Sequence, residues 1–578
     1  MRACFAAAIA VLLTLLTAAP GTAQTIYPID RADILVGAKF DFKVEFPNTT
    51  APKDIKVTVN GRDAAQVFGK APIVEANEEG LDHSAYWIRD VSLGQPGTYE
   101  VTAAVGDASQ TVKWEVFGTP QRRARNVILF IADGLSMAHR TAARVLAKGL
   151  VEGRYGGELA IDDMPHMALV STSGTDSIVT DSANSMSAYT TGHKSCVNAM
   201  GIYCARNKSG LAHPKVETIV ELVKRHNGGM AVGVVTNTEI EDATPAAMVA
   251  HVRRRGDYDE IVRMFHDAKP DVMMGGGSGF FLPKSDKAGK RKDEENYIEK
   301  FKALGYRFAA TATEMEAGAA DKSTTRLLGL FHPGNLDGAL DRHVLKKGTV
   351  PNYPDQPDLA DQTQAAIDIL SRKPSGFVLM VEAGLIDKYS HALDWERAVY
   401  DTIMLDNAVK VAKRFAADRN DTLISSSPTT PIPSASSAPT TTSGRASACA
   451  TSSASTPRQS SPTIPRPVRT AIHSRSTCRA AWLSCSLAFP TIALLASRTS
   501  PDRSSRRNRK TRRRWPTRST ARRKRRGCKA ICPSANRRAF TPQTMSCSPP
   551  WALERSCSRA ASTIRACSAR WRPRSGWE

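Results

Sequence analysis

Two kinds of hydrophobic periodicity follow one another along this chain. Between Gln24 and Gly118, apolar and polar residues alternate in short runs, among them DILVGAKFDFKVEF and TYEVTAAV, and Asn-Gly and Pro-Gly pairs separate the runs. Alternation with period two between turn residues predicts half-buried β-strands. At about 95 residues, residues 24–118 therefore predict a small all-β domain of the immunoglobulin-like sandwich type.

Residues 119–424 carry continuous apolar runs instead, such as VILFIADG, MAVGVVTN and FVLMVEAG, with helical stretches between them. A short run that is apolar throughout is typical of a strand buried on both faces. Strands that alternate with helices predict an α/β fold around a parallel sheet.

Residues able to bind metals stand close to the ends of these apolar runs. The run that begins at residue 126 closes with Asp133 and a glycine, and the run that begins at residue 377 contains Glu382, followed by Asp387 and His391. Parallel strands deliver the side chains at their carboxyl ends to one edge of the sheet, where sites gather. Asp387 and His391 are four residues apart, so a helical turn would put both on one face. A carboxylate and an imidazole so placed are a common pair of zinc ligands.

A candidate nucleophile lies in Val179–Gly192, VTDSANSMSAYTTG, where Ser182 follows an aspartate within a run of small residues. A serine hydroxyl is a weak nucleophile at neutral pH unless a base or a metal takes its proton. No histidine stands near Ser182 in a G-x-S-x-G pattern, which favours activation by a metal. A further segment, EDATPAAMVAH, adds hydroxyl and carboxylate groups, and three arginines follow it.

These four segments, in this order, resemble alkaline phosphatase over about residues 125–420. The resemblance implies a sheet sandwiched between helices and hydrolysis of phosphate monoesters through a phosphoserine formed on Ser182. It implies that Arg255 clamps the phosphate, because a planar guanidinium matches two phosphate oxygens. Arg253 and Arg254 remain rivals for that role, which spacing alone does not exclude.

The resemblance also implies two zinc sites and one magnesium site, in which Asp133 bridges one zinc and the magnesium. The other implied ligands are Thr244 and Glu382 for magnesium, with Asp242 close by, and Asp387 and His391 for the second zinc. The family needs two more segments, an Asp-His pair after a later strand and a histidine near the C-terminus. As written, the chain contains neither of these segments, and the histidine that follows His391 is His473.

Composition changes where the Asp-His pair is expected. Residues 425–578 contain 30 lysines and arginines against 3 acidic residues, and 8 of the 11 cysteines. The whole chain carries a net charge of +23, so its basic balance comes from this tail. Such a composition predicts a disordered basic arm, and a non-enzymatic protein that binds nucleic acid is the corresponding alternative. The same composition is typical of a GC-rich gene that is read out of frame.

The sequence itself favours an out-of-frame tail. Suppose that each true codon takes the last base of one written codon and the first two of the next. Pro428–Pro433 then permits A-D-H-T-H-S, and Ala539–Glu554, with its flanking bases, permits GVHTADDVVLTAMGPGA. The first string supplies an Asp-His pair after the strand DTLI, and the second resembles the late histidine segment of the family. Both segments return in one constant frame, so we interpret the chain as frameshifted near Ile424, with its phosphatase activity impaired.

The N-terminus predicts export to the periplasm or the medium. A positive charge, a short apolar run and small residues before Gln24 form a signal peptide over residues 1–23. The run is short for a membrane span, which makes a membrane anchor the weaker alternative. Oxidising conditions outside the cytoplasm predict a disulfide between Cys196 and Cys204, the two cysteines that lie between the signal peptide and the break.

Four segments are therefore predicted: a signal peptide (1–23), a β-sandwich domain (24–118), a truncated catalytic domain (119–424) and an out-of-frame tail (425–578). We expect small phosphate monoesters as substrates, no nucleic acid and no membrane span, and the sequence leaves a homodimer open. The enzymatic alternative is a phosphodiesterase or sulfatase on the same scaffold.

Overall fold

A computed structural model describes residues 24–47, 50–226 and 229–429 of the protein. The predicted signal peptide and residues 430–578, which make up most of the predicted tail, lie outside the described residues. Within the described part of the chain, no helix is long and apolar enough to cross a membrane.

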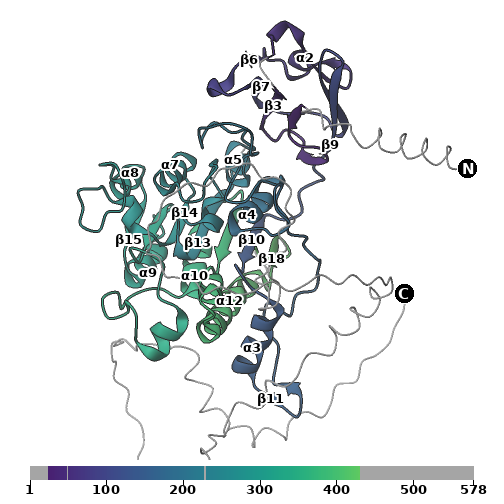
Figure 1. The fold of residues 1–578 in the computed structure, drawn as a ribbon. Helices are drawn as coiled ribbons and strands as arrows, with labels where there is room; N and C mark the ends of the chain where they lie inside the picture. Colours follow the sequence, from purple (N-terminus) through teal and green to yellow (C-terminus); the bar gives the residue numbers. More distant parts are fainter. Residues whose placement is uncertain (1–23, 48–49, 227–228, 430–578) are drawn as a thin grey trace, which may run out of the picture. The chain divides into compact units, whose positions relative to one another are not determined.

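Residues 24–118 form two β-sheets (Figure 1). Their apolar core includes Phe42, Val101 and Trp114. The four-stranded sheet has the order β1 (Thr25–Tyr27), β3 (Phe40–Pro47), β7 (His83–Val91), β6 (Ile73–Glu75). The five-stranded sheet has the order β2 (Ala32–Leu35), β9 (Ala108–Phe117), β8 (Gly97–Val105), β4 (Ile55–Val59), β5 (Arg62–Asp63), and α2 (Ala64–Phe68) follows β5. This arrangement agrees with the predicted β-sandwich, and its immunoglobulin-like class stays a prediction.

One predicted run of alternating residues divides between the two sheets. β2 pairs with β9, whereas β3 pairs with β7 in the other sheet. The chain turns between them at Gly37, whose φ of 76° lies in the left-handed region that favours glycine. Both strands keep a period of two, so the alternation alone does not reveal that the chain changes sheets.

The second part of the chain is built on a seven-stranded sheet in which every strand pair is parallel, as the continuous apolar runs predict. Its order is β15 (Arg307–Ala309), β16 (Leu327–Leu330), β14 (Val272–Gly276), β13 (Ala231–Glu239), β17 (Phe377–Glu382), β10 (Asn126–Ile131), β18 (Thr422–Ser427). Outside this sheet, β11 (Leu150–Val151) and β12 (Arg154–Tyr155) form a separate antiparallel pair.

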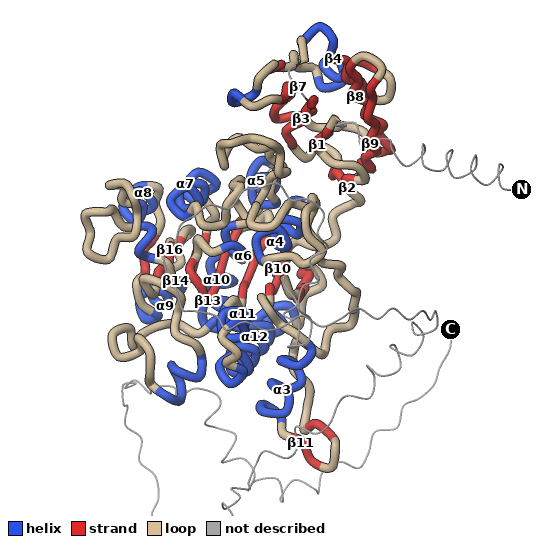
Figure 2. The backbone as a smooth tube through the Cα atoms, in the orientation of Figure 1, coloured by secondary structure: helices blue, strands red, loops and turns tan. Residues whose placement is uncertain are grey.

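Helices cover both faces of the sheet, which places one apolar core on each side (Figure 2). The core that contains Ile128 and Phe130 of β10 is covered by α3 (Met137–Lys148), α9 (Ala312–Ala320), α10 (Leu359–Leu370) and α12 (Trp395–Ala416). The core that contains Val232 and Val234 of β13 is covered by α4 (Ser182–Thr191), α5 (Ile219–Arg225), α6 (Ala243–Ala246), α7 (Tyr258–Ala268) and α8 (Tyr297–Ala303). The sheet sandwiched between helices is therefore present.

The edge strand β18 continues past the predicted break at Ile424. Ser425, Ser426 and Ser427 pair with Leu129, Phe130 and Ile131 of β10. We expected residues 425–578 to lack a fold, and the first of them differ from that expectation. Strand pairing is made by backbone groups, so it continues for a few residues whatever the side chains are.

Candidate active site

The start of α4 holds Ser182 at the carboxyl end of the sheet. Asp181 caps the helix by accepting from the Asn184 N–H at 3.0 Å, and Asn184 accepts in return from the Asp181 N–H at 2.9 Å. Ser182 is the first residue of the helix, is buried, and donates its hydroxyl to Asp133 Oδ2 at 2.8 Å. The exposed N–H groups at a helix start favour an anion, so this position suits a phosphate group.

The turn after β10 brings Asp133 against the helix α11 (Leu385–His391). Gly134 has a φ of 70°, and a Cβ there would lie 2.7 Å from the Asp387 Cα atom. Only glycine allows this approach, which explains the Asp-Gly pair that closes the strand. The predicted ligands Asp133 and Asp387 are thereby brought close together.

Glu382, the last residue of β17, lies beside hydroxyl groups from β13. Thr236 donates to Glu382 Oε2 at 2.5 Å and Thr238 donates to the same atom at 3.2 Å. Burial, and after it the negative charge of Asp133, raise the pKa of Glu382 to about 8. Two buried carboxylates so close repel each other, a cost that a bound cation would remove.

Thr244, at the start of the short helix α6, completes this group. Its hydroxyl lowers the pKa of Glu382, but its buried oxygen makes no hydrogen bond of good geometry to any described residue. A buried polar atom without such a bond is costly unless another partner binds it. Oxygen atoms from Asp133, Glu382 and Thr244 are the kind of ligand that magnesium prefers, so the residues present fit this ion.

Asp387 and His391 lie on one face of α11, as their spacing predicts. His391 Nε2 is 3.3 Å from Asp387 Oδ2, and the imidazole is largely exposed whereas the carboxylate is buried. Burial, and after it the charge of Asp133, raise the pKa of Asp387 to about 6. A carboxylate and an imidazole that share a water-accessible position are suited to zinc.

The position of α11 is fixed from β13 by Asn237, which the sequence did not single out. The Asn237 Oδ1 atom accepts from the Gly384 N–H at 2.8 Å and from the Leu385 N–H at 3.2 Å. Its Nδ2 group donates to Asp401 Oδ1 on α12 at 3.3 Å. This link between three elements is visible only once the chain is folded, because the residues are far apart in sequence.

Of the three candidate arginines, Arg255 lies closest to the predicted nucleophile group. It donates to Asp242 Oδ1 at 2.8 Å, and its Nη1 atom is 3.7 Å from Asp181 Oδ2. Arg253 instead donates to the Val197 carbonyl at 3.1 Å. The charge of Arg254 acts on Asp257, where it partly offsets the rise in pKa that burial causes. The geometry therefore favours Arg255 over its two rivals.

A second cation at this position, Lys388, was missed by the sequence reasoning. It donates to Asp242 Oδ2 at 2.5 Å. Burial alone would raise the pKa of Asp242, but Lys388 and Arg255 together lower it to about 2. Its place directly after Asp387 gives no reliable signal, because consecutive residues of a helix do not share a face. Asp242 thus holds two cations in place beside Ser182 and Asp133.

The described residues after β18 reach Asp133, at the position where the family's Asp-His pair is expected. The Thr429 hydroxyl donates to Asp133 Oδ1, and Thr429 is fully buried. Ser185 Oγ donates to the Thr429 carbonyl and Tyr189 Oη donates to the Pro428 carbonyl, both at 2.7 Å. The described chain therefore has threonine, not a carboxylate or imidazole, at this end of the site.

The predicted disulfide between Cys196 and Cys204 is confirmed, with 6.0 Å between the two Cα atoms. It closes part of the loop that follows α4. All seven predicted site residues lie around the carboxyl ends of β10, β13 and β17, and their roles stay predictions.

Residues 124–431 match a family model described as alkaline phosphatase. Among curated proteins, the chain is 32% identical to alkaline phosphatase H of Pseudomonas aeruginosa over 55% of this chain and 71% of that protein. It is 33% identical to an alkaline phosphatase of Escherichia coli over 52% of this chain and 69% of that protein. It is also 32% identical to the tissue-nonspecific alkaline phosphatase of Gallus gallus, over 52% of this chain and 63% of that protein.

Among solved structures, an alkaline phosphatase of Thermus thermophilus is 28% identical with a TM-score of 0.46, over 54% of this chain and 60% of that chain. One from a Shewanella species is 26% identical with a TM-score of 0.44, over 53% of this chain and 67% of that chain. The family assignment rests on the family model and the curated relatives.

Proposed function

Because the chain belongs to the alkaline phosphatase family of phosphate-monoester hydrolases, we propose that it acts through Ser182 and forms a phosphoserine. The observation that carries this proposal is the contact of Ser182 Oγ with Asp133 at the start of α4, beside Arg255. The hydroxyl is buried at a helix N-terminus, where a phosphate dianion would be stabilised.

We propose two zinc ions and one magnesium ion as cofactors. Asp133, Glu382 and Thr244 would hold the magnesium, Asp387 and His391 would contribute to one zinc, and Asp133 with Ser182 would face the other. When bound, these cations neutralise the crowded carboxylates and lower the pKa of the serine hydroxyl. The raised pKa values of Glu382 and Asp387 support this assignment, since the carboxylates are crowded when no cation separates them.

The remaining residues orient the substrate. Arg255 presents its planar guanidinium to two phosphate oxygens, and a hydrogen bond to Asp242 holds the guanidinium in place. Lys388, held by the same carboxylate, adds positive charge on the same side. Ser182 Oγ attacks phosphorus, the bond to the leaving alcohol oxygen breaks, and water later cleaves the phosphoserine to release inorganic phosphate.

We also propose that this chain is impaired by a frameshift near Ile424. The family match ends at residue 431, although 578 residues are present. In the shifted frame, Pro428, Thr429 and Thr430 permit Ala, Asp and His. The contact of Thr429 with Asp133 supports this reading, because an aspartate there would lie beside Asp133 and Ser182.

The assignment of the nucleophile is tested in a protein whose frame is corrected after Ile424. Changing Ser182→Ala should lower the hydrolysis of p-nitrophenyl phosphate by on the order of 10³-fold or more, because the reacting oxygen is lost. Metal content should change little. Ser177→Ala, a serine outside the cluster, is the control and should keep its rate. A Ser182→Ala protein with a near-normal rate would remove the basis of the proposal.

We propose further that the protein is exported after a cut behind Ala23 and acts in the periplasm or the medium. Small phosphate monoesters are its proposed substrates, and a homodimer is its proposed assembly. Mass spectrometry of the exported protein should give an N-terminus at Gln24, and a retained leader would contradict export. A phosphodiesterase or sulfatase remains the second candidate, and a higher rate on a diester or a sulfate ester would favour it.

A further inference from the structure

Residues 24–118, the β domain, lie outside the match to the family model, which begins at residue 124. Their apolar core is nevertheless completed by two residues from the loop that follows α4. Tyr203 and Val216, each 1% exposed, belong to the same cluster as Phe42 and Trp114. The β domain therefore shares its core with the catalytic part of the chain.

Backbone hydrogen bonds reinforce this shared core. We call residues 200–217 the linking ribbon, because antiparallel bridges join Ile202 to Lys215 within it and Phe40 of β3 to Val216. The Asp41 N–H donates to the Lys215 carbonyl at 2.8 Å, and the Glu217 N–H donates to the Lys39 carbonyl at 2.9 Å. The ribbon thus extends the sheet of the β domain by a short strand-like segment.

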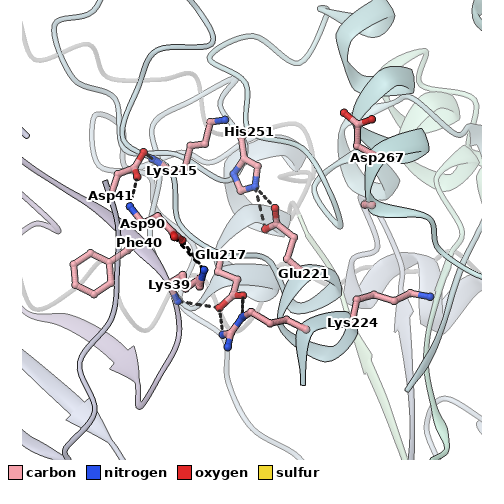
Figure 3. A pocket seen from close by; sticks show the side chains of 12 residues that line it. Lys39, Phe40, Asp41, Asp90, Lys215, Glu217, Glu221, Lys224, His251 and Asp267 are labelled. Atoms are coloured by element: carbon pink, nitrogen blue, oxygen red, sulfur yellow. Dashed lines mark hydrogen bonds and ion pairs between the residues drawn. The ribbon is translucent and has the colours of Figure 1, made fainter. Parts of the chain in front are cut away.

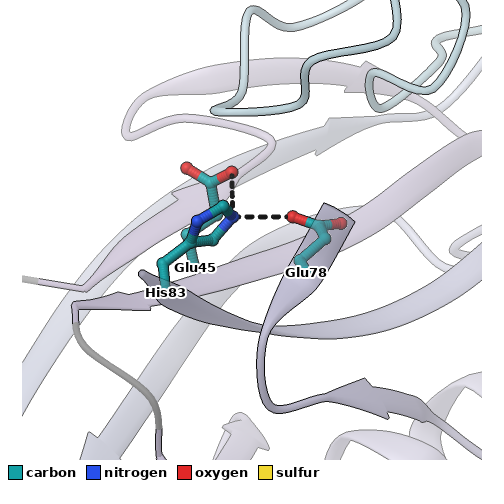
Figure 4. Close-up of side chains that lie close together, drawn as sticks. All are labelled: Glu45, Glu78 and His83. Carbon is teal, nitrogen blue, oxygen red and sulfur yellow. Dashed lines mark hydrogen bonds and ion pairs between the residues drawn. The ribbon is translucent and has the colours of Figure 1, made fainter. Parts of the chain in front are cut away.

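A buried polar network also holds the contact between the β domain and the linking ribbon, which we call the joint. Glu45, Glu78 and His83 lie close enough together to suggest a metal site (Figure 4). However, the Lys43 ammonium lies 2.7 Å from both Glu45 Oε1 and Glu78 Oε2, so a cation is already present. Lys43 also donates to Asn207 Oδ1 of the ribbon at 2.8 Å. Removing one partner of such a buried network is strongly destabilising, so the joint resists opening.

A cavity of about 500 Å³ lies at the joint (Figure 3). Charged side chains of the β domain and of the catalytic part line it. Glu217 and Arg225, both of the catalytic part, pair with each other here and bond to backbone groups of the β domain. The Lys39 N–H donates to Glu217 Oε2 at 2.9 Å, and Arg225 donates to Glu217 Oε1 at 2.7 Å and to the Gly37 carbonyl at 3.0 Å. We therefore interpret this cavity as part of the joint and assign it no ligand.

The ribbon is in turn attached to the helix that begins with Ser182. The Tyr203 hydroxyl and His193 Nδ1 share a hydrogen bond of 2.6 Å, and His193 directly follows Gly192, the C-cap of α4. In the middle of the helix, Ser187 Oγ accepts from the Gly201 N–H at 2.9 Å. Burial lowers the pKa of His193 to about 4, so the imidazole is neutral near pH 7 and needs no counter-ion.

We propose that the β domain is an intramolecular brace for α4: it fixes the linking ribbon, and the ribbon holds the helix that presents Ser182 through Tyr203 and His193. These two are positioning residues, since neither touches the reacting atoms. One hydroxyl group, that of Tyr203, joins the core of the β domain to the end of the helix.

Hydrogen–deuterium exchange on the full chain tests this brace. Tyr203→Phe keeps the ring and removes the hydroxyl, so peptides over residues 186–193 should exchange about tenfold faster, while peptides from β3 and β7 keep their rates. Tyr99→Phe is the matched control, because its hydroxyl bonds to Gln95 within the β domain. It should leave α4 unchanged.

A pair of variants at His193 separates positioning from general stability. His193→Ala should repeat the effect of Tyr203→Phe, and His193→Asn, whose amide reaches the position of Nδ1, should restore most of the protection. Unchanged exchange over residues 186–193 in both Tyr203→Phe and His193→Ala would overturn the brace. A uniform rise across the whole chain, or no difference between the two His193 variants, would also overturn it. The readout involves neither metal nor catalysis, so its failure is distinct from failure of the proposed function.

Discussion

Asn237 connects β13 and α12 to the start of the helix that carries Asp387 and His391. Changing Asn237→Ala removes the acceptor for two buried N–H groups, and we expect a loss of about 2 kcal/mol or more in the free energy of unfolding. Urea denaturation measures this loss. Asn352→Ala, at an exposed position, is the control, and equal stability of the two variants would contradict this role of Asn237.

Asp401, the partner of Asn237, should make stability depend on pH. Burial raises its pKa from 3.8 to about 7, although Arg342 opposes the shift. The folded state therefore holds the proton more tightly than the unfolded state. This contribution to stability is complete below about pH 4 and is lost as the pH rises through 7.

Changing Asp401→Asn removes the titrating group while keeping a similar shape. Denaturation at pH 5 and pH 8 should show a smaller loss of stability on raising the pH than in the unchanged protein. Asp368→Asn, on the exposed side of α10, should behave like the unchanged protein. A pH dependence that Asp401→Asn leaves unaltered would show that other groups cause it.

At this scale the sequence predicted residues that sit in recognisable local patterns and missed those that act across elements. Asp133 follows a strand, and Ser182 and Asp387 lie in the first turns of helices. The residues beside them in sequence therefore indicate where they lie in the fold. Lys388 and Asn237 gain their roles from partners on other strands and helices. The choice among the three arginines also needed the fold, because it depends on which side chain reaches Asp242.

Among the elements, apolar runs predicted the strands β10, β13 and β17 because a parallel strand buried on both faces has no polar side. The sequence did not predict that the run before residue 47 changes sheets at Gly37, since period-two alternation is the same in both sheets. Nor did it predict that β18 extends to Ser427, because backbone pairing is insensitive to the serines there.

The loop after α4 gives a prediction at the element scale. Its disulfide closes a short loop, and converting both Cys196 and Cys204 to alanine should lower the free energy of unfolding by about 2 kcal/mol. Peptide-level mass spectrometry without reductant should find neither thiol alkylated. Alkylation of both would contradict the bond, and the single change Ser209→Ala in the same loop region serves as the stability control.

For the whole molecule, the sequence predicted four segments of different character, and the structure adds how two of them, residues 24–118 and 119–424, are joined. Period-two alternation and continuous apolar runs distinguish residues 24–118 from residues 119–424. No sequence pattern predicts that Tyr203 packs in the core of the β domain. That contact joins residues far apart in the chain. The positive net charge of the molecule comes from the tail (425–578), of which residues 430–578 lie outside the described residues.

Above all, we propose that a metal-dependent phosphatase site is built around Ser182 and is left incomplete by a change of frame. The most direct test expresses this sequence beside a version corrected after Ile424 and measures phosphate release and bound zinc on equal amounts of protein. We predict that the corrected protein binds zinc and hydrolyses phosphate monoesters, whereas this chain retains neither tight zinc binding nor fast hydrolysis. Equal zinc content and equal activity in the two proteins would contradict the account.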